Sequence, residues 1–253
     1  MSLLILGGTA DARKMATQLF IDGLPLIYSV AGLVRVPKVD CQIVSGGFRQ
    51  RGGLVHYIRQ QGITAILDAT HPYASSMSQQ AAQAAELCQL PYWRFNRAAW
   101  QPEPDDNWQY FSQWSSLVTD LQPYNTIFFT LGQLEQDLFT ELTRLTQFTQ
   151  RHLVVRTAVS PKINLLSNMQ WVKAIGPFNL TEELALLKKH KVEALVTKNS
   201  GGEATVAKLA AARALNIPVF MQTRPELPTA EQSFSDLVSC QQFILAQDFL
   251  FNS

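Results

Sequence analysis

The stretch LLILGGTADARKMATQLF, residues 3–20, carries the pattern that decides the fold. Leu3–Leu6 is a short aliphatic run that ends at Gly7-Gly8, which is typical of a buried parallel strand rather than a helix. After it, apolar residues recur at i, i+3, i+4, i+7 and i+8 from Ala12 to Phe20, which predicts one buried face of a helix. The stretch therefore predicts a strand, a glycine-rich turn and a helix.

The same alternation continues along the rest of the chain. Further strands are predicted at residues 26–30, 65–67, 92–95, 126–129, 153–156, 171–175, 194–197 and 219–221. Further helices are predicted at residues 76–88, 180–189 and 203–215. Strands separated by helical stretches of about ten to fifteen residues indicate βαβ units and parallel sheets. Because the pattern occurs twice, we expect an α/β protein of two domains, residues 1–130 and 131–253; a single large sheet is the alternative.

The composition excludes several classes of protein. The 253 residues include 21 Lys or Arg and 20 Asp or Glu, a net charge of +1, whereas a nucleic-acid binder normally carries a basic excess. The first apolar run is too short for a signal peptide or a membrane span. Cys41, Cys88 and Cys240 lack the spacing of a disulfide framework or a zinc site. We therefore expect a reduced, soluble, cytoplasmic protein, a monomer or weak homodimer, with no metal, membrane or nucleic-acid partner.

The loops that follow the predicted strands are the candidate sites, because ligands of open parallel sheets bind outside the carboxyl ends of the strands. In the first loop, Gly7–Arg13, two glycines and the start of a helix can present backbone N–H groups to a phosphate. The loop departs from Gly-x-Gly-x-x-Gly, since Thr9 and Ala12 replace the second and third glycines. A tight turn in which Asp11 caps the helix is the alternative.

The second loop bears on the cofactor. The second strand ends in Ser29-Val30-Ala31-Gly32, and the next acidic residue is Asp40. An NAD-binding unit of this kind carries Asp or Glu at that strand end to bind the ribose hydroxyls, and such an acid would repel a ribose phosphate. Its absence, with Ser29, Arg35 and Lys38 close by, favours NADP over NAD. Arg35 and Lys38 are equally well explained as ordinary surface cations.

Two more loops follow strands in the first half of the chain, residues 45–49 (SGGFR) and residues 68–74 (DATHPYA). The pair Gly46-Gly47 allows a flat ligand to lie against the backbone. His71 is a candidate for proton transfer, with a structural hydrogen bond as the alternative. Asp68 is expected to hold the N–H groups of its own loop.

The fifth loop, residues 197–203 (TKNSGGE), lies in the second half of the chain. A lysine, two hydrogen-bonding side chains and two glycines at a helix N-terminus make a cradle for an anion. A capping turn with Ser200 explains the serine and the glycines, but it gives no reason for Lys198. The sequence contains no P-loop of the ATP-hydrolysing type, no Gly-x-Ser-x-Gly nucleophile elbow and no His-x-x-x-His metal pair.

Taken in order, these motifs resemble the precorrin-6A reductase family, NADPH-dependent enzymes of corrin-ring (vitamin B12) biosynthesis. The matching strings are Gly7-Gly8-Thr9 with Ala12-Arg13, Ser29 with Ala31-Gly32, Gly46-Gly47-Phe48, residues 68–74, Gly176-Pro177-Phe178, residues 198–202, Ala211-Ala212-Arg213, Ile217-Pro218-Val219 and Arg224-Pro225. The chain departs from the family at Arg49, where a glycine is expected, and at Arg97-Ala98, where a proline is expected after the arginine. Residues 101–150 match loosely.

The resemblance implies two Rossmann-like domains with mainly parallel sheets, NADPH on the N-terminal one and a tetrapyrrole in the cleft between them. Hydride would pass to a carbon–carbon double bond of precorrin-6A or cobalt-precorrin-6A, giving the precorrin-6B level of reduction. The expected cofactor-binding residues are Gly7, Gly8, Thr9, Asp11, Arg13, Ser29, Ala31, Gly32, Arg35, Gly46, Gly47, Thr70, His71 and Pro72. The expected substrate-binding residues are Lys198, Asn199, Ser200, Gly201, Gly202, Arg94, Arg97 and Arg224. The proton would come from His71, Tyr73 or solvent.

The near-zero net charge adds one expectation about these cations. A charge of +1 attracts a polycarboxylate weakly over long range, so Arg94, Arg97, Lys198 and Arg224 are expected to line one cleft.

Two other functions stay open. A methyltransferase that uses S-adenosylmethionine shares the glycine-rich loop but usually has an acid at the second strand end, and a non-catalytic NADP-binding sensor would use residues 198–202 to bind a partner. The apolar C-terminal segment, residues 237–249, is expected to pack on its own domain.

Overall fold

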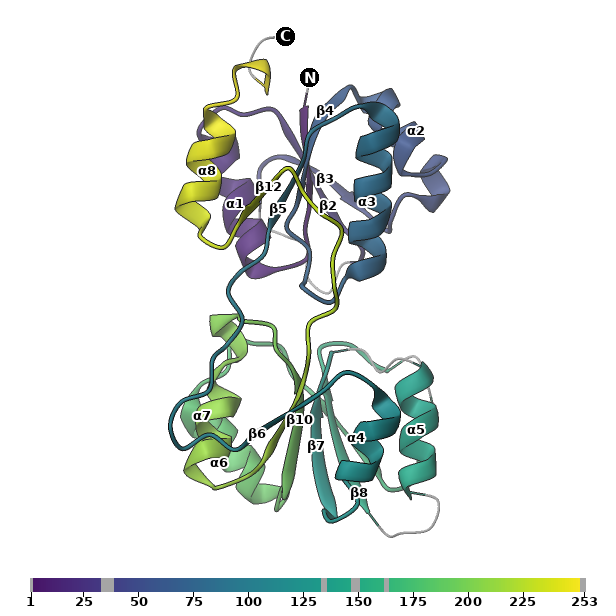
Figure 1. Cartoon of the computed structure of the whole chain (residues 1–253), viewed down its shortest axis with the longest axis vertical. Helices are drawn as coiled ribbons and strands as arrows, with labels where there is room; N and C mark the ends of the chain where they lie inside the picture. The colour runs from purple at the N-terminus through teal and green to yellow at the C-terminus, as the bar shows by residue number, and fades with distance from the viewer. Residues whose placement is uncertain (1, 33–38, 133–135, 147–150, 162–163, 251–253) are drawn as a thin grey trace. The chain divides into compact units, whose positions relative to one another are not determined.

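The computed structural model describes residues 2–32, 39–132, 136–146, 151–161 and 164–250. These residues form two six-stranded sheets, with strand orders β12-β5-β4-β1-β2-β3 and β6-β11-β10-β7-β8-β9 (Figure 1). Every strand pair in the described residues is parallel. The predicted α/β fold with parallel sheets is confirmed.

The first sheet is built mainly from the N-terminal part of the chain. Its strands are β1 (Ser2–Leu6), β2 (Leu26–Val30), β3 (Gln42–Ser45), β4 (Ile63–Asp68), β5 (Tyr92–Phe95) and β12 (Gln232–Phe234). The helical segments around it are α1 (Ala10–Ile21), the 3-10 turn η1 (Arg49–Arg51), α2 (Leu54–Gln61), α3 (Ser75–Cys88), α8 (Leu237–Leu245) and the 3-10 turn η3 (Asp248–Leu250).

Strand β1 explains why the first apolar run has no polar alternation. Leu3 and Ile5 enter a core that contains the buried face of α1 and residues of α8, whereas Leu4 and Leu6 enter a second core with residues of α2 and α3. Figure 1 shows these two pairs of helices on opposite faces of the sheet. A strand covered on both faces has no solvent side, so all four positions from Leu3 to Leu6 are apolar.

The second sheet lies in the middle of the chain. Its strands are β6 (Trp108–Phe111), β7 (Thr126–Thr130), β8 (His152–Thr157), β9 (Met169–Lys173), β10 (Ala194–Lys198) and β11 (Val219–Gln222). Its helical segments are α4 (Trp114–Asp120), α5 (Gln136–Thr146), α6 (Leu180–Lys189), the 3-10 turn η2 (Glu203–Thr205) and α7 (Ala207–Ala214). The predicted helix at residues 203–215 is thus divided into η2 and α7.

The two sheets exchange their edge strands. β6 follows β5 in the chain but pairs with β11, and β12 follows β11 but pairs with β5. The chain therefore divides into unit 1, residues up to 98 and from 225 onward, and unit 2, residues 99–224. This division differs from the predicted boundary between residues 130 and 131, because the pairing of β6 and β12 joins segments that are distant in sequence.

The position of the C-terminal segment follows from this exchange of edge strands. Cys240 and Ile244 of α8 lie in the same core as Leu3 and Ile5 of β1, and Gln241 Nε2 donates to the Asp22 carboxylate over 2.6 Å. The segment packs on its own domain, as expected, but that domain is unit 1 with the N-terminal sheet rather than residues 131–253. The strand β12 that precedes α8 is the reason, since it brings the chain back to β5.

Candidate functional site

The β1–α1 loop is held by its threonine. Thr9 Oγ1 accepts a hydrogen bond from the Ala12 N–H over 3.0 Å, which makes Thr9 the N-cap of α1, and it donates to the Ala69 carbonyl over 3.2 Å. The alternative in which Asp11 caps the helix is therefore wrong. Asp11 lies in the first turn and forms an ion pair with Arg97, with 3.2 Å between Oδ2 and Nε.

The two glycines of this loop are required for different reasons. A Cβ on Gly7 would lie 2.3 Å from Cε2 of Tyr28, so the ring of Tyr28 occupies that space. Gly8 has φ of +113°, and no described atom lies within 4 Å of the position of its missing Cβ. The backbone at Gly8 therefore needs glycine, and the space beside it is open for a ligand.

Tyr28 is a residue of the site that the sequence reasoning missed. Its hydroxyl accepts a hydrogen bond from the Gly8 N–H over 3.2 Å, while its ring is buried in β2. Burial raises the pKa of the Tyr28 hydroxyl, so the group stays protonated and can donate a hydrogen bond at neutral pH. Nothing in the apolar string LIYSV separates this tyrosine from an ordinary core residue.

The ends of β2 and β3 lie beside the glycine loop. Gly7 N–H donates to the Ser29 carbonyl over 2.8 Å, and Gly46 N–H donates to the Val30 carbonyl over 3.2 Å. Ser29 is buried, whereas Ala31 and Gly32 are exposed. Gly46 and Gly47 have φ of +88° and +72° with no described atom near the missing Cβ. Arg35 lies outside the described residues.

Asp68 organises the loop after β4. One carboxylate oxygen accepts from the Thr70 N–H and hydroxyl over 3.1 and 2.7 Å, as expected for a residue that holds its own loop. The other oxygen accepts from the Tyr92 hydroxyl over 2.8 Å and lies 3.6 Å from Arg94 Nε. Burial and Asp68 both raise the pKa of Tyr92, which is therefore protonated and a donor.

Arg94 has an internal role that differs from the expected contact with substrate. The residue is 7% exposed, its Nη1 donates to the Pro228 carbonyl over 2.6 Å, and its Nη2 donates to the Tyr92 hydroxyl. The guanidinium thus connects β5 to the segment before β12 and neutralises Asp68 inside unit 1. The sequence pattern did not reveal that β5 is covered on both faces.

The two candidate proton donors lie next to each other on the same loop. The Tyr73 N–H donates to Nδ1 of His71 over 3.3 Å, and the two ring centres are 5.7 Å apart. Because Nδ1 accepts here, the proton of neutral His71 is carried by Nε2. His71 is exposed, Tyr73 and Thr70 are partly buried, and Pro72 is buried.

The Lys198–Gly202 loop of unit 2 follows the end of β10. Gly201 has φ of +71°, which favours glycine, and the Ser200 N–H donates to the Lys198 carbonyl over 2.9 Å. Lys198 and Ser200 are partly exposed, whereas Gly202 is buried. The loop can therefore present one amine and one hydroxyl to an anion.

Asn199 anchors this loop rather than extending from it. Its Oδ1 accepts from the Trp100 N–H over 2.8 Å and its Nδ2 donates to the Trp100 carbonyl over 3.2 Å. Its own carbonyl accepts from Arg224 Nε over 2.8 Å, and the residue is 6% exposed. These contacts differ from the expected contact between the Asn199 side chain and a substrate.

The predicted cations are divided between the two units. Arg94 and Arg97 belong to unit 1, and Lys198 and Arg224 belong to unit 2. Of the four, Arg94 and Arg97 pair with Asp68 and Asp11, respectively, and Arg224 donates to the Asn199 carbonyl.

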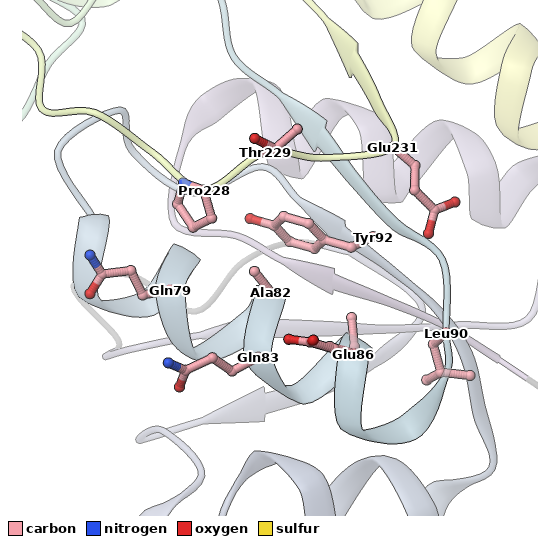
Figure 2. Close-up of a pocket in the computed structure, with 10 residues that line it drawn as sticks. Gln79, Ala82, Gln83, Glu86, Leu90, Tyr92, Pro228, Thr229 and Glu231 are labelled. Carbon is pink, nitrogen blue, oxygen red and sulfur yellow. The ribbon is translucent and has the colours of Figure 1, made fainter.

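A pocket of about 510 Å³ in unit 1 is lined by none of the predicted site residues, although Tyr92 and Pro228 in its lining are hydrogen-bonded to Arg94. Figure 2 shows the Tyr92 side chain between α3 and the segment Pro228–Thr229, and Glu86 and Glu231 also line the pocket. Both glutamates would repel a phosphate or a carboxylate. The pocket is therefore unsuited to the anionic ligands that the motifs predict.

Two absences apply to the described parts of the chain. They contain no helix that is long and apolar enough to cross a membrane. They also contain no group of three or more His, Cys, Asp or Glu side chains that could hold a metal ion.

Comparison with known proteins assigns the family. Residues 2–244 match the family model described as precorrin-6x reductase CbiJ/CobK. A precorrin-6A reductase of Rhodococcus erythropolis is 37% identical, covering 93% of this chain and 94% of that protein. One of Rhodobacter capsulatus is 32% identical, covering 90% of each. The solved structure titled CobK precorrin-6A reductase is 30% identical, with a TM-score of 0.85 over 97% of this chain and 96% of that one. The chain therefore belongs to the precorrin-6x reductase family.

Proposed function

We propose that the protein uses NADPH to reduce one carbon–carbon double bond of precorrin-6A or of its cobalt-containing form. The observation that carries the NADPH proposal is the edge of the first sheet, where the glycine loop after β1 meets a β2 end without an acidic side chain. An acid at that place would favour NAD by binding ribose hydroxyls and repelling a ribose phosphate. The identity with precorrin-6A reductases supports the choice of substrate.

The residues around Gly8 are suited to a dinucleotide. Open space beside Gly8, Gly46 and Gly47 allows a ligand to approach the backbone, and the N-terminus of α1 favours a negative charge. The Tyr28 hydroxyl, already bonded to Gly8, would add a donor toward the phosphates. Arg13, Ser29, Ala31, Gly32, Thr70 and Pro72 complete the proposed contacts, and Asp11 acts through its ion pair with Arg97.

The bound nicotinamide would supply the hydride, and the protein would position the substrate and deliver the proton. The hydride adds to one carbon of the double bond and a proton adds to its neighbour, while NADPH becomes NADP⁺. His71 and Tyr73 lie side by side on the loop after β4, where the Tyr73 N–H donates to Nδ1 of His71, so these two side chains are the proposed donors. The main catalytic contribution of the chain is to hold the nicotinamide and the double bond of the substrate close together in the right orientation.

The substrate carboxylates would meet the Lys198–Gly202 loop. Lys198 is a point charge at the end of β10, and Ser200 adds a hydroxyl donor beside it. Arg224 and Arg97 are further candidate partners. We assign Arg94 and Asn199 to holding the protein structure, because both are buried and bonded to main-chain groups of their own unit.

Binding and turnover measurements test this proposal and separate the alternative functions. Titration with NADPH, NADH and S-adenosylmethionine is expected to give selective binding of NADPH. Oxidation of NADPH is expected only after precorrin-6A or cobalt-precorrin-6A is added. Selective binding of S-adenosylmethionine would favour a methyltransferase. Binding of NADPH without oxidation in the presence of either ring would contradict the reductase and favour a sensor.

An Ala31→Asp variant tests the proposed reason for NADPH selectivity. Ala31 is exposed at the end of β2, so the new carboxylate would stand where NAD-binding units carry their acid. We expect the Kd for NADPH to rise by about tenfold or more and the preference over NADH to shrink. Ala31→Asn is the matched control, since it has the same size without the charge. Equal effects of both variants would refute the electrostatic explanation.

A further inference from the structure

Unit 2 contains a buried lysine that none of the proposed steps uses. Lys208 lies in the first turn of α7 and is 3% exposed. Its Nζ donates to the Thr205 carbonyl over 2.8 Å and lies 4.7 Å from the centre of the Trp100 ring. No carboxylate among the described residues forms an ion pair with it. Its cation is therefore stabilised by an aromatic face and one carbonyl.

A buried ion pair, Arg156 with Glu183, interacts electrostatically with Lys208. Arg156 of β8 is paired with Glu183 of α6, and the Arg156 guanidinium lies 3.9 Å from the centre of the Phe178 ring. Burial, together with the nearby charge of Arg156, lowers the pKa of Lys208 to about 7, although Glu183 acts in the opposite direction. An amine is expensive to bury, whereas an apolar side chain of the same length would carry no such cost. The unfavourable free energy of burying this amine indicates that Lys208 has a role other than packing.

The contacts of Lys208 lead to both flanks of the Lys198–Gly202 loop. On one side, its amine lies over the ring of Trp100, whose main chain is bonded twice to Asn199. On the other side, the amine holds the carbonyl of Thr205 in η2, the turn that directly follows Gly202. One side chain thus connects the segment that anchors the loop to the segment that ends it.

We propose that Lys208 is a positioning residue, which holds the Lys198–Gly202 loop in its anion-binding conformation through Trp100 and Thr205. Its burial keeps it away from substrate, so it acts through the loop rather than by contact. The role in substrate binding rests on the proposed function. The role in holding the loop depends only on the contacts described and is open to a separate measurement.

Hydrogen exchange measures the loop directly. In Lys208→Met, a side chain of similar length without the amine, we expect amide exchange in residues 198–206 to accelerate by about tenfold or more. Exchange in residues 3–21 of unit 1 should not change. Lys188→Met is the matched control, because Lys188 is exposed on α6. Unchanged exchange in residues 198–206 of a folded Lys208→Met protein would overturn the proposal.

Steady-state kinetics separates this role from general destabilisation, which would not change the KM for the tetrapyrrole alone. Lys208→Met is expected to raise KM for the tetrapyrrole by about tenfold while kcat and the KM for NADPH stay within about twofold. A fall in kcat with unchanged KM for the tetrapyrrole would refute a role in presenting the loop. If the wild-type protein reduces neither ring, the proposed function fails, and the exchange experiment still decides the role of Lys208.

A second variant covers the case in which Lys208→Met does not fold. Trp100→Leu removes the ring beneath the amine but leaves the main-chain groups that bond to Asn199. Faster exchange in residues 198–206 is expected here as well, because Lys208 then loses one of its two contacts. Exchange equal to that of the wild-type protein in this variant would also overturn the proposal.

Discussion

Replacing Asp68 by Asn is expected to lower the free energy of unfolding by about 3–5 kcal/mol. Asp68 is 1% exposed and faces Arg94, which is 7% exposed, so the substitution leaves an arginine charge buried without its counter-charge. Oδ1 of the asparagine can still accept from Thr70, but the amide nitrogen would point its hydrogens at Arg94 and the Tyr92 hydroxyl. The loss therefore comes from the charge, because the size of the side chain barely changes.

Urea unfolding of the wild-type protein and the Asp68→Asn variant measures this loss. Asp40→Asn is the control, since Asp40 is exposed in the same unit and its substitution should change the stability by less than about 0.5 kcal/mol. A loss of 3–5 kcal/mol is a large part of the 5–15 kcal/mol that stabilises a typical domain, so the variant should unfold at clearly lower urea. The slope of the transition should be unchanged.

A double-mutant cycle with Arg94→Met decides whether the reasoning is right. Once Arg94 is absent, Asp68→Asn no longer leaves an unpaired cation, so the two losses should be strongly non-additive. We expect a coupling energy above about 1 kcal/mol. Losses that add within about 0.5 kcal/mol, or a loss below about 1 kcal/mol for Asp68→Asn alone, would refute the assignment of Arg94 and Asp68 as a buried, stabilising pair.

Three further predictions follow from contacts elsewhere in the molecule. Gly7→Ala should lower stability by about 1–3 kcal/mol, seen as a fall in Tm, because its Cβ would lie 2.3 Å from the Tyr28 ring. Stability should rise between pH 7 and 10.5, since Lys208 has a pKa of about 7 when folded and 10.5 when exposed, so that the unfolded chain binds more protons over this range. In Lys208→Met, the free energy of unfolding, measured with urea at several pH values over this range, should lack the rise that Lys208 contributes. Burial raises the pKa of Cys240 to about 12, so iodoacetamide should label the partly exposed Cys88 and spare Cys240 until the protein unfolds, as mass spectrometry of the native protein would show.

The sequence by itself determined the layered α/β fold and the loops that carry the candidate site. The run Leu3–Leu6, the glycines after it and the apolar face of α1 are local features, and each is set by backbone geometry or by periodicity. Strands β2 and β5 and helix α6 have the residue ranges that were predicted from the same signals. Parallel register then brings the loops after β1, β2 and β4 to one edge of the sheet, as expected.

Tertiary structure alone decided which strands complete each sheet and which polar side chains turn inward. β6 and β12 pair with strands far away in the chain, and no local pattern encodes such a partner. Arg94 and Asn199 look like surface ligands in sequence, yet long-range contacts with Pro228 and Trp100 fix them inside their units. A side chain's direction in a strand is local, but whether that direction leads to solvent or to a core depends on the segments that cover it.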